Sequence, residues 1–418
     1  MTKRKDSTLI QIVHPICCGL DVHKDKISAC LITVDDTGAE QHELREFTTF
    51  TYDLQKMKKW LIENKCPIIA MESTGVYWHP IYNTVGDAMD VTLVNARHIK
   101  NVPGRKTDIA DSKWLAGLLR HGLLKGSFIP PEKVREWREL SRLRKTYTES
   151  LADYKRRVHK LFITANIKID SVVSDLFGMT GLNLIDLLCN NSELTMGKVQ
   201  ECTKGRLKKK VPELYSCLHG YFKDHHRFQL VGMMETINMF QKRIEQINIR
   251  LESLMCEHKD LLERLDEIPG IDKKSAQSIL GEIGITLDDF RSMSAFVSWA
   301  GLCPGNNESA GKRKSGRNAV RYHPFKTILV QVAWAAIKKK DSYYKAKYYK
   351  LKARRGAKKA IVAIAHRIAK AIYNIVKNGE SYKDLGEDYL CKPTKQRVLK
   401  HLMKKANELG MKLVPCEN

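Results

Sequence analysis

Short apolar runs separated by turns dominate the first part of the chain. Runs at 16–20 and 27–34 flank a polar stretch at 23–26, and this spacing is typical of a β-hairpin. The same pattern predicts three more strands, at 42–50, 67–71 and 91–94, and helices at 52–64, at 76–89 and from Asp108 onward. The element order β-β-β-α-β-α-β-α predicts an α/β unit that occupies residues 10–128.

Long helical patterns replace these short runs in the remainder of the chain. Apolar residues recur at helical spacing from Glu132 to Ile167 and again from Leu230 to Leu265. They predict a helical or coiled-coil region over residues 129–264, whose two long helices pack antiparallel within the chain or pair with another chain. Residues 265–380 are predicted to form a mainly α-helical C-terminal domain, followed by a C-terminal extension at 381–418.

Four carboxylates stand at chemically suggestive places in the predicted α/β unit. Asp21 ends the first strand and Glu72 the fourth, and both should lie at the same edge of the sheet. Asp108 and Asp111 are three residues apart, on one face of the helix that begins there. Each acid taken singly is typical of a solvated strand end or a helix N-terminus. Four acids at one edge repel one another unless cations lie between them, which favours one or two Mg²⁺ ions.

The element order and the acids together predict a ribonuclease H-like domain. Carboxylate oxygens suit Mg²⁺, which also binds phosphate oxygens. Two such ions can hold a phosphodiester between them and stabilise both the attacking and the leaving oxygen. The front part of the chain is therefore predicted to act on nucleic acid.

The charge balance agrees with a polyanionic partner. The chain of 418 residues holds 72 Lys and Arg against 47 Asp and Glu, a formal net charge of +25. Cations and tyrosines alternate most densely at 338–359, where cations can follow a nucleic-acid backbone and tyrosines can stack on bases or be buried in the core.

The cellular setting is predicted from what the sequence lacks. No apolar run is long enough to span a bilayer, and the first residues lack the apolar core of a signal peptide. The 11 cysteines show no CxxC and no zinc-like grouping, so they are interpreted as reduced thiols of a cytoplasmic protein.

Two segments of the C-terminal domain carry candidate phosphate chemistry. A Pro269-Gly270 turn followed by Lys273 and Lys274 resembles a helix-hairpin-helix element, in which backbone N–H groups at a helix start bind phosphate. An ordinary helix–helix turn is the alternative. Ser309 and Ser315 lie in a second segment rich in turn residues and cations. Either hydroxyl could be a nucleophile whose target phosphate the cations hold, and the residues alone do not rank the two serines.

Many short motifs in a fixed order resemble one family, the DEDD transposases of bacterial insertion sequences. This is a family of bridge-RNA-guided serine recombinases that includes the Piv-type invertases. In the front part the motifs are Gly19-Leu20-Asp21-Val22-His23-Lys24, Met71-Glu72-Ser73-Thr74-Gly75, Lys106-Thr107-Asp108-Ile109-Ala110-Asp111-Ser112, Leu118-Leu119-Arg120-His121-Gly122-Leu123 and Arg138-Glu139-Leu140-Ser141-Arg142. In the rear part they are Ile268-Pro269-Gly270-Ile271, Gly301-Leu302-Cys303-Pro304 and Glu308-Ser309-Ala310-Gly311-Lys312.

The resemblance implies a fold and a chemistry. The first domain should be Holliday-junction-resolvase-like, with Asp21, Glu72, Asp108 and Asp111 as an acidic tetrad that binds Mg²⁺. The nucleophilic serine of the family corresponds to Ser309, although Ala310 stands where the family often has Gly. The loop at 316–322 also lacks the usual Lys-Gly-Asn.

The resemblance also implies partners. These are donor and target DNA, a structured non-coding guide RNA, and further copies of the chain, as dimers that pair into a tetramer with a shared active site. Candidate nucleic-acid-binding residues are Lys106, Gly270, Lys273, Lys274, Lys312, Arg313, Lys314, Arg317 and Arg321.

Two other functions remain open from the sequence. One is a metal-dependent Holliday-junction-type endonuclease in which water attacks and Ser309 only binds phosphate. The other is an RNA- or DNA-binding protein without catalysis, against which the four acids argue.

Overall fold

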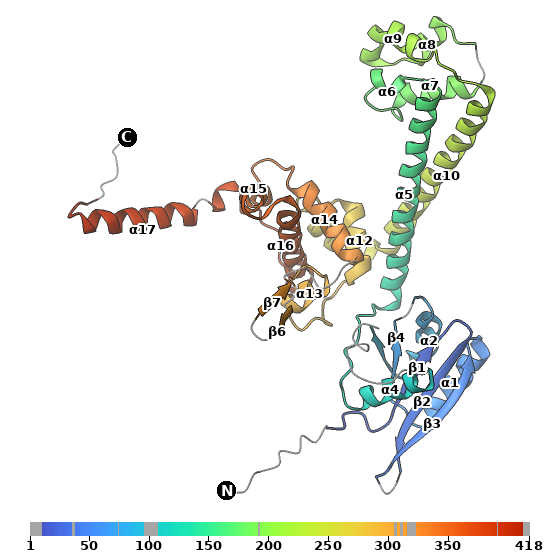
Figure 1. Cartoon of the computed structure of the whole chain (residues 1–418), viewed down its shortest axis with the longest axis vertical. Coiled ribbons are helices and arrows are strands. Elements are labelled where there is room, and N and C mark those ends of the chain that lie inside the picture. The colour runs from blue at the N-terminus through green and yellow to red at the C-terminus, as the bar shows by residue number, and fades with distance from the viewer. Residues whose placement is uncertain are drawn as a thin grey trace. The chain divides into compact units, whose positions relative to one another are not determined.

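A computed structural model shows two compact units, a front unit (Met1–Ile129) and a rear unit (Pro130–Asn418) (Figure 1). The structure describes residues 11–35, 38–73, 75–95, 108–190, 193–304, 307–309, 312–315, 323–390 and 392–412. Side chains at 108–110, 307–309, 312–315, 388, 390, 392–398 and 400 are outside this description. Among the described residues, no helix is both long and apolar enough to cross a membrane.

The front unit is a five-stranded mixed sheet with helices, in the expected order. Its elements are β1 (Cys17–Val22), β2 (Lys26–Val34), β3 (Glu40–Thr48), α1 (Thr51–Glu63), β4 (Ile68–Glu72), α2 (Trp78–Val85), β5 (Asp90–Val94) and α4 (Asp108–Arg120). The strand order is β3-β2-β1-β4-β5. The first three strands pair antiparallel, whereas β1–β4 and β4–β5 are parallel. An α/β unit followed by helices is thereby confirmed.

The sheet buries a different set of side chains on each face. One face, with Leu20 and Met71, packs on α1 and α2. The other face, with Cys17 and Ala70, packs on Ala116 and other residues of α4. Since successive strand residues point to opposite faces, a residue's position in its strand decides which helices cover it.

The buried thiols of this unit behave as apolar core groups. Cys17, Cys18, Cys30 and Cys66 are buried, and every cysteine in the described part of the chain is free. Burial raises the pKa of Cys17 to about 12 and the pKa values of Cys30 and Cys66 to about 11. Their thiols therefore stay protonated and poorly reactive.

The rear unit begins with a long helical hairpin. Its first elements are α5 (Glu132–Thr164), α6 (Ile169–Val172), α7 (Met179–Cys189), α8 (Met196–Cys202), a 3₁₀ segment (Gly205–Lys210), α9 (Val211–Cys217) and α10 (Asp224–Leu254). Helices α5 and α10 lie side by side, as Figure 1 shows, and ring pairs such as Tyr147–Phe240 join them at 5.6 Å. Of the two arrangements left open by the sequence, the chain therefore adopts the internal pairing.

The second long helix is shorter than its apolar pattern predicted. It ends at Leu254 rather than Leu265, and a 3₁₀ turn (Cys256–His258) leads into a separate helix, α11 (Lys259–Asp266). Met255 at the break is fully buried, and its carbonyl accepts the His258 N–H at 3.0 Å. The chain changes direction at the break, and Leu261, Leu262 and Leu265 of α11 are buried in the C-terminal region.

The C-terminal region consists mainly of helices. After α11 come α12 (Lys273–Ile283), α13 (Met293–Trp299), β6 (Asn307–Ser309), β7 (Lys312–Ser315), α14 (Pro324–Ala336), α15 (Tyr343–Arg355), α16 (Ala357–Asn378), a 3₁₀ segment (Glu387–Leu390) and α17 (Lys392–Glu408). Phe296 is central to the core and lies within 6.0 Å, between ring centroids, of Phe290, Trp299, Phe325 and Tyr373.

Three arginines fasten the hairpin to this region. Arg138 donates to the carbonyls of Gly281 (3.1 Å) and Glu282 (2.7 Å) at the end of α12. Arg142 forms a bidentate pair with the buried Glu282 carboxylate, at 2.8 and 2.9 Å. Arg144 is itself buried and donates to Gln277 and to the Lys274 carbonyl. These bonds are charge-assisted, and Arg138 and Arg144 are largely shielded from water, so together they hold α5 against α12.

His323, just before α14, should make the stability of the rear unit depend on pH. Its Nδ1 is buried without a hydrogen-bond partner in the described part of the chain, and burial lowers its pKa to about 4. The unfolded chain takes up the proton first, near its ordinary pKa of about 6.5. The unfolding free energy should therefore fall as pH drops from about 6.5, by about 3 kcal/mol at pH 4.

Urea unfolding of the native chain and of His323→Gln across this pH range measures the difference. The variant should lose this component of the pH dependence, whereas His401→Gln, at an exposed position of α17, should retain it. Parallel pH profiles for the native chain and His323→Gln would contradict the assignment.

Candidate functional site

The register of the sheet places Asp21 and Glu72 on neighbouring strands at one edge. Strands β1 and β4 run parallel, with Leu20 opposite Met71 as the last pair of the ladder. Asp21 and Glu72 each follow that pair by one residue. Their positions in the alternation put them on the face covered by α4, opposite to Leu20 and Met71. Both side chains are half-buried.

Helix α4 runs antiparallel to β1 and brings its first turn to the same edge. At the far end of α4, the Arg120 carbonyl accepts the N–H groups of Val13 and His14, at 2.9 and 3.0 Å. Nearer its middle, the Cys17 thiol donates to the Ala116 carbonyl at 3.5 Å. The start of α4 therefore lies toward the carboxyl end of β1. The first turn of α4 carries Asp108 and Asp111.

Gly19 permits this close packing of helix on sheet. A Cβ atom at Gly19 would lie 2.2 Å from the Ser112 carbonyl oxygen and 2.4 Å from the Ala116 nitrogen. Both are backbone atoms, so they can give way only if the helix moves. The sequence contains this glycine in the run before Asp21, but its hydrophobic pattern carries no signal that a helix rests on it.

His23 is a further residue of the site. Sequence reasoning placed it in a polar turn and in a family motif but gave it no role at the site. Its Nε2 lies 3.1 Å from Oδ2 of Asp21, a hydrogen-bond distance. The Asp21 side chain is 16% exposed and that of His23 47%. A histidine in this position restricts the rotamer of the carboxylate, as groups around metal-binding carboxylates commonly do.

The described acids lie at one edge of the sheet but do not form a complete metal-binding site. Among the side chains that the structure describes, no group of three or more His, Cys, Asp or Glu lies close enough to hold a metal ion. Asp111 is half-buried, and the Asp108 side chain falls outside that set. The oxygen-only donors nevertheless suit a hard cation such as Mg²⁺ in their chemistry.

The candidate serines lie on a two-stranded hairpin in the rear unit. In the backbone register of β6 and β7, Ser309 pairs with Lys312 beside the turn, while Ser315 pairs with Asn307 at the opposite end. An irregularity in the register separates Asn307 from Glu308. The hairpin gives Ser309 a defined place in the backbone where the sequence indicated only a turn-rich segment. Lys106, Arg317 and Arg321 lie outside the described residues.

The turn before α12 is used for packing. Gly270 has φ +86°, and a Cβ there would lie 2.5 Å from the Val332 carbonyl oxygen of α14. Asp272 caps α12 by accepting the Ser275 N–H at 2.8 Å, and Lys273 pairs with Glu252. Lys274 is exposed. This glycine therefore serves a helix–helix contact, and phosphate binding at the turn stays a prediction.

Helices α15 and α16 together form a cationic face. Burial lowers the pKa of Lys347, and the positive charges of Arg367, Lys350 and Arg354 lower it further. Burial, Lys370 and Arg367 likewise lower the pKa of His366. A cluster of cations that repel one another favours binding of a polyanion. Sequence reasoning found the cations of α15 and the first two of α16, Lys358 and Lys359, but missed Arg367 and Lys370, which are interspersed in an apolar helical pattern.

The tyrosines of α15 are mostly structural. Tyr343, Tyr344 and Tyr348 are buried, and only Tyr349 among these four is exposed. Of the two roles considered from the sequence, burial in the core holds for three of them. Tyr349 is 56% exposed, with the Lys352 ammonium 5.8 Å from its ring centroid, so stacking of a base stays a prediction for this tyrosine alone.

Two family models match the chain, and together they cover more than half of it. Residues 18–166 match a DEDD transposase model of the IS110 type, and residues 262–350 match the model described as "Transposase IS116/IS110/IS902 family". No curated protein matches the chain. A ribonuclease H-compatible sheet unit joined to a helical unit, matched in both parts by transposase models, defines a DNA-processing transposase. The chain belongs to the IS110 family of DEDD transposases, which confirms the resemblance drawn from its motifs.

Proposed function

We propose that this transposase cuts and rejoins DNA through a serine nucleophile and a Mg²⁺-binding acidic tetrad, guided by a non-coding bridge RNA. The observation that carries the proposal is the edge shared by Asp21, Glu72 and the first turn of α4. The register of β1 with β4 places Asp21 and Glu72 at this edge, and the direction of α4 independently places its first turn there. Gly19 supports the proposal by allowing α4, which carries the other two acids, to pack closely on β1.

The fold and domain assignments that accompany this function are part of the proposal. The front domain, residues 10–128, is a ribonuclease H and Holliday-junction-resolvase-like fold. It is followed by a coiled-coil region at 129–264, a C-terminal transposase domain with a helix-hairpin-helix-like element at 265–380, and an extension at 381–418. The mixed sheet and the helix α4 packed on it support the first assignment.

Asp21, Glu72, Asp108 and Asp111 would hold one or two Mg²⁺ ions. When bound, Mg²⁺ neutralises charge on a phosphodiester and stabilises its attacking and leaving oxygens. The carboxylates supply hard oxygen ligands, and His23 restrains the orientation of Asp21. Asp108, one turn before Asp111, would complete the donor set.

Ser309 would be the nucleophile. Its Oγ forms a bond to the phosphorus, one P–O bond of the DNA backbone breaks, and the departing oxygen takes up a proton as the serine hydroxyl loses one. The covalent phosphoserine conserves the energy of the broken bond, so the reverse attack by a DNA hydroxyl can rejoin a different strand. Strand exchange then proceeds through a junction intermediate.

The partners follow from the same function. The cationic face of α15 and α16 would bind the DNA backbone, and the guide RNA would pair with target and donor DNA. Lys106, Gly270, Lys273, Lys274, Lys312, Arg313, Lys314, Arg317 and Arg321 are the proposed further nucleic-acid contacts. Dimers that pair into a tetramer would let the acids of one copy act with Ser309 of another, in the cytoplasm.

Replacing Glu72 by Gln tests the acidic site. The substitution keeps the size of the side chain but removes a charge. The rate of Mg²⁺-dependent DNA cleavage should fall roughly 100-fold, because about 2.7 kcal/mol of transition-state stabilisation is lost. Glu63→Gln, at an exposed position of α1 in the same unit, is the matched control and should cleave at the native rate. Undiminished cleavage by Glu72→Gln would remove the acid from the mechanism.

A further inference from the structure

A small helical domain closes one end of the hairpin, in a stretch of the chain that neither family model matches. Helices α6 to α9 connect α5 to α10 there, as Figure 1 shows, and lie between the two matched segments. They share a hydrophobic core with the adjoining ends of α5 and α10. Helix α5 alone has 33 residues, which at 1.5 Å per residue makes it about 50 Å long.

One segment of this domain carries a dense group of exposed cations. These five residues, here called the tip cations, are Lys204, Arg206, Lys208, Lys209 and Lys210. No acid interrupts them in the sequence, and Lys210 forms a surface ion pair with Glu213 at 3.9 Å. Within the described part of the chain, the other four have no ion-pair partner.

The backbone that carries the tip cations is held firmly. Thr203, just before them, is 1% exposed, and its hydroxyl donates to the Val199 carbonyl at 2.6 Å. The Lys204 N–H donates to the Thr180 hydroxyl at 3.1 Å. Leu207, in the middle, packs on the core of the domain, and Val211, just after them, is buried.

This anchoring distinguishes the tip cations from an ordinary solvated lysine run. With the apolar positions fixed inward, the charged side chains have to face solvent together. Their backbone entropy is already lost in folding, so a polyanion that binds them orders only the side chains. A phosphate backbone supplies charges at the close, regular spacing that such a group can neutralise.

We propose that the tip cations bind the phosphate backbone of double-helical nucleic acid at a second site, on elements that carry neither the acids nor Ser309. The contact is independent of sequence and of the cleavage chemistry. It adds affinity and extends the length of DNA or RNA that one copy covers. Because both duplexes present the same phosphate chemistry, the test has one arm for each.

The test compares Arg206→Gln/Lys208→Gln/Lys209→Gln with the native chain. The probes are a DNA duplex of several helical turns and an RNA hairpin of equal length, and binding is measured by fluorescence anisotropy over a range of salt concentrations. For the duplex that the tip cations contact, affinity should fall roughly tenfold at low salt, and the slope of log K against log salt should become shallower by about 2 to 3. The probe whose affinity and salt slope change identifies the partner of the tip cations as DNA, RNA or both.

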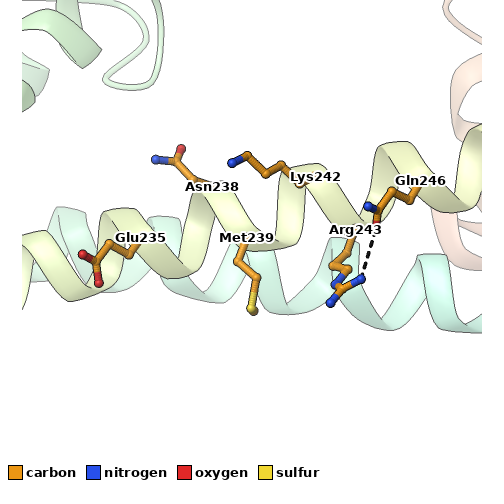
Figure 2. A pocket seen from close by; sticks show the side chains of 6 residues that line it. All are labelled: Glu235, Asn238, Met239, Lys242, Arg243 and Gln246. Carbon is orange, nitrogen blue, oxygen red and sulfur yellow. Dashed lines mark hydrogen bonds between the residues drawn. The ribbon is translucent and has the colours of Figure 1, made fainter.

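The control variant removes the same charge from exposed cations along the hairpin, through Lys160→Gln/Lys242→Gln/Arg243→Gln. Lys242 and Arg243 line a shallow hollow on α10 with Glu235, Asn238, Met239 and Gln246 (Figure 2). The hollow also contains Glu235, and Arg243 donates a hydrogen bond to Gln246 at 3.1 Å. The control should bind both probes nearly as the native chain does.

Two outcomes would overturn the proposal. One is an unchanged salt slope in both arms, and the other is an equal loss in the control variant, which would show an effect of net charge alone. Lys209→Gln, a single exposed change that the fold tolerates, should lower the slope by about 1 and checks the triple variant. Since binding is read without cleavage, failure here is distinct from failure of the serine mechanism.

Discussion

Ser309→Ala should abolish both DNA cleavage and the covalent protein–DNA product, by a factor on the order of 10⁴ or more. The reason is that a serine recombinase has no bond to form once Oγ is missing, whatever the acids still hold. The measurement is a denaturing gel of labelled DNA incubated with the transposase, its RNA and Mg²⁺. A band of protein-linked DNA should appear with the native chain and be missing with Ser309→Ala.

Ser315→Ala is the matched control because it lies on the same hairpin. Ser315 pairs with Asn307 at the end away from the turn, whereas Ser309 adjoins the turn. The two variants remove the same atom from two ends of one small sheet, so an effect on hairpin folding would appear in both. Loss of the adduct in Ser315→Ala, with retention in Ser309→Ala, would reassign the nucleophile.

The same gel separates the two other functions that the sequence left open. A junction endonuclease that uses water would keep cutting after Ser309→Ala and would never show protein-linked DNA. A protein that only binds nucleic acid would give no Mg²⁺-dependent processing with the native chain. Each of the two alternative functions therefore gives a gel pattern that differs from the pattern expected for the serine mechanism.

The sequence predicted most elements of the front unit because their signals are local. Short apolar runs bounded by turn residues predict the strands, and Asp21 and Glu72 stand at strand ends that can be read directly. Whether they share a face depends on the pairing of β1 with β4, a contact between residues about fifty positions apart. The position of α4 on the sheet depends on Gly19 accepting a helix backbone, which leaves no trace in hydrophobic periodicity.

In the rear unit, the features that the sequence did not predict are those that depend on packing between two elements. The long apolar pattern continues through Met255, so nothing local marks the break that tertiary packing imposes there. Arg367 and Lys370 join the cations of α15 only because α16 folds against it. Likewise, Arg144 lies within a long charged helical pattern that gives no sign of its burial, and its guanidinium is buried against α12.

Gly19→Ala should destabilise the front unit by about 3 kcal/mol and reduce Mg²⁺-dependent cleavage as well. The added methyl would meet the Ser112 oxygen and the Ala116 nitrogen well inside contact distance, so α4 must shift and carry Asp108 and Asp111 away from the edge. Gly117→Ala is the matched control on α4 itself.

A Cβ at Gly117 has nothing within 4 Å, and alanine there should stabilise the helix by about 0.5–1 kcal/mol. Thermal unfolding measures the stability, and cleavage at a temperature where both variants remain folded measures the placement of the acids. If helix and sheet together build the site, Gly19→Ala loses cleavage even while folded, and Gly117→Ala does not. A folded Gly19→Ala that cleaves at the native rate would show that α4 does not position the acids.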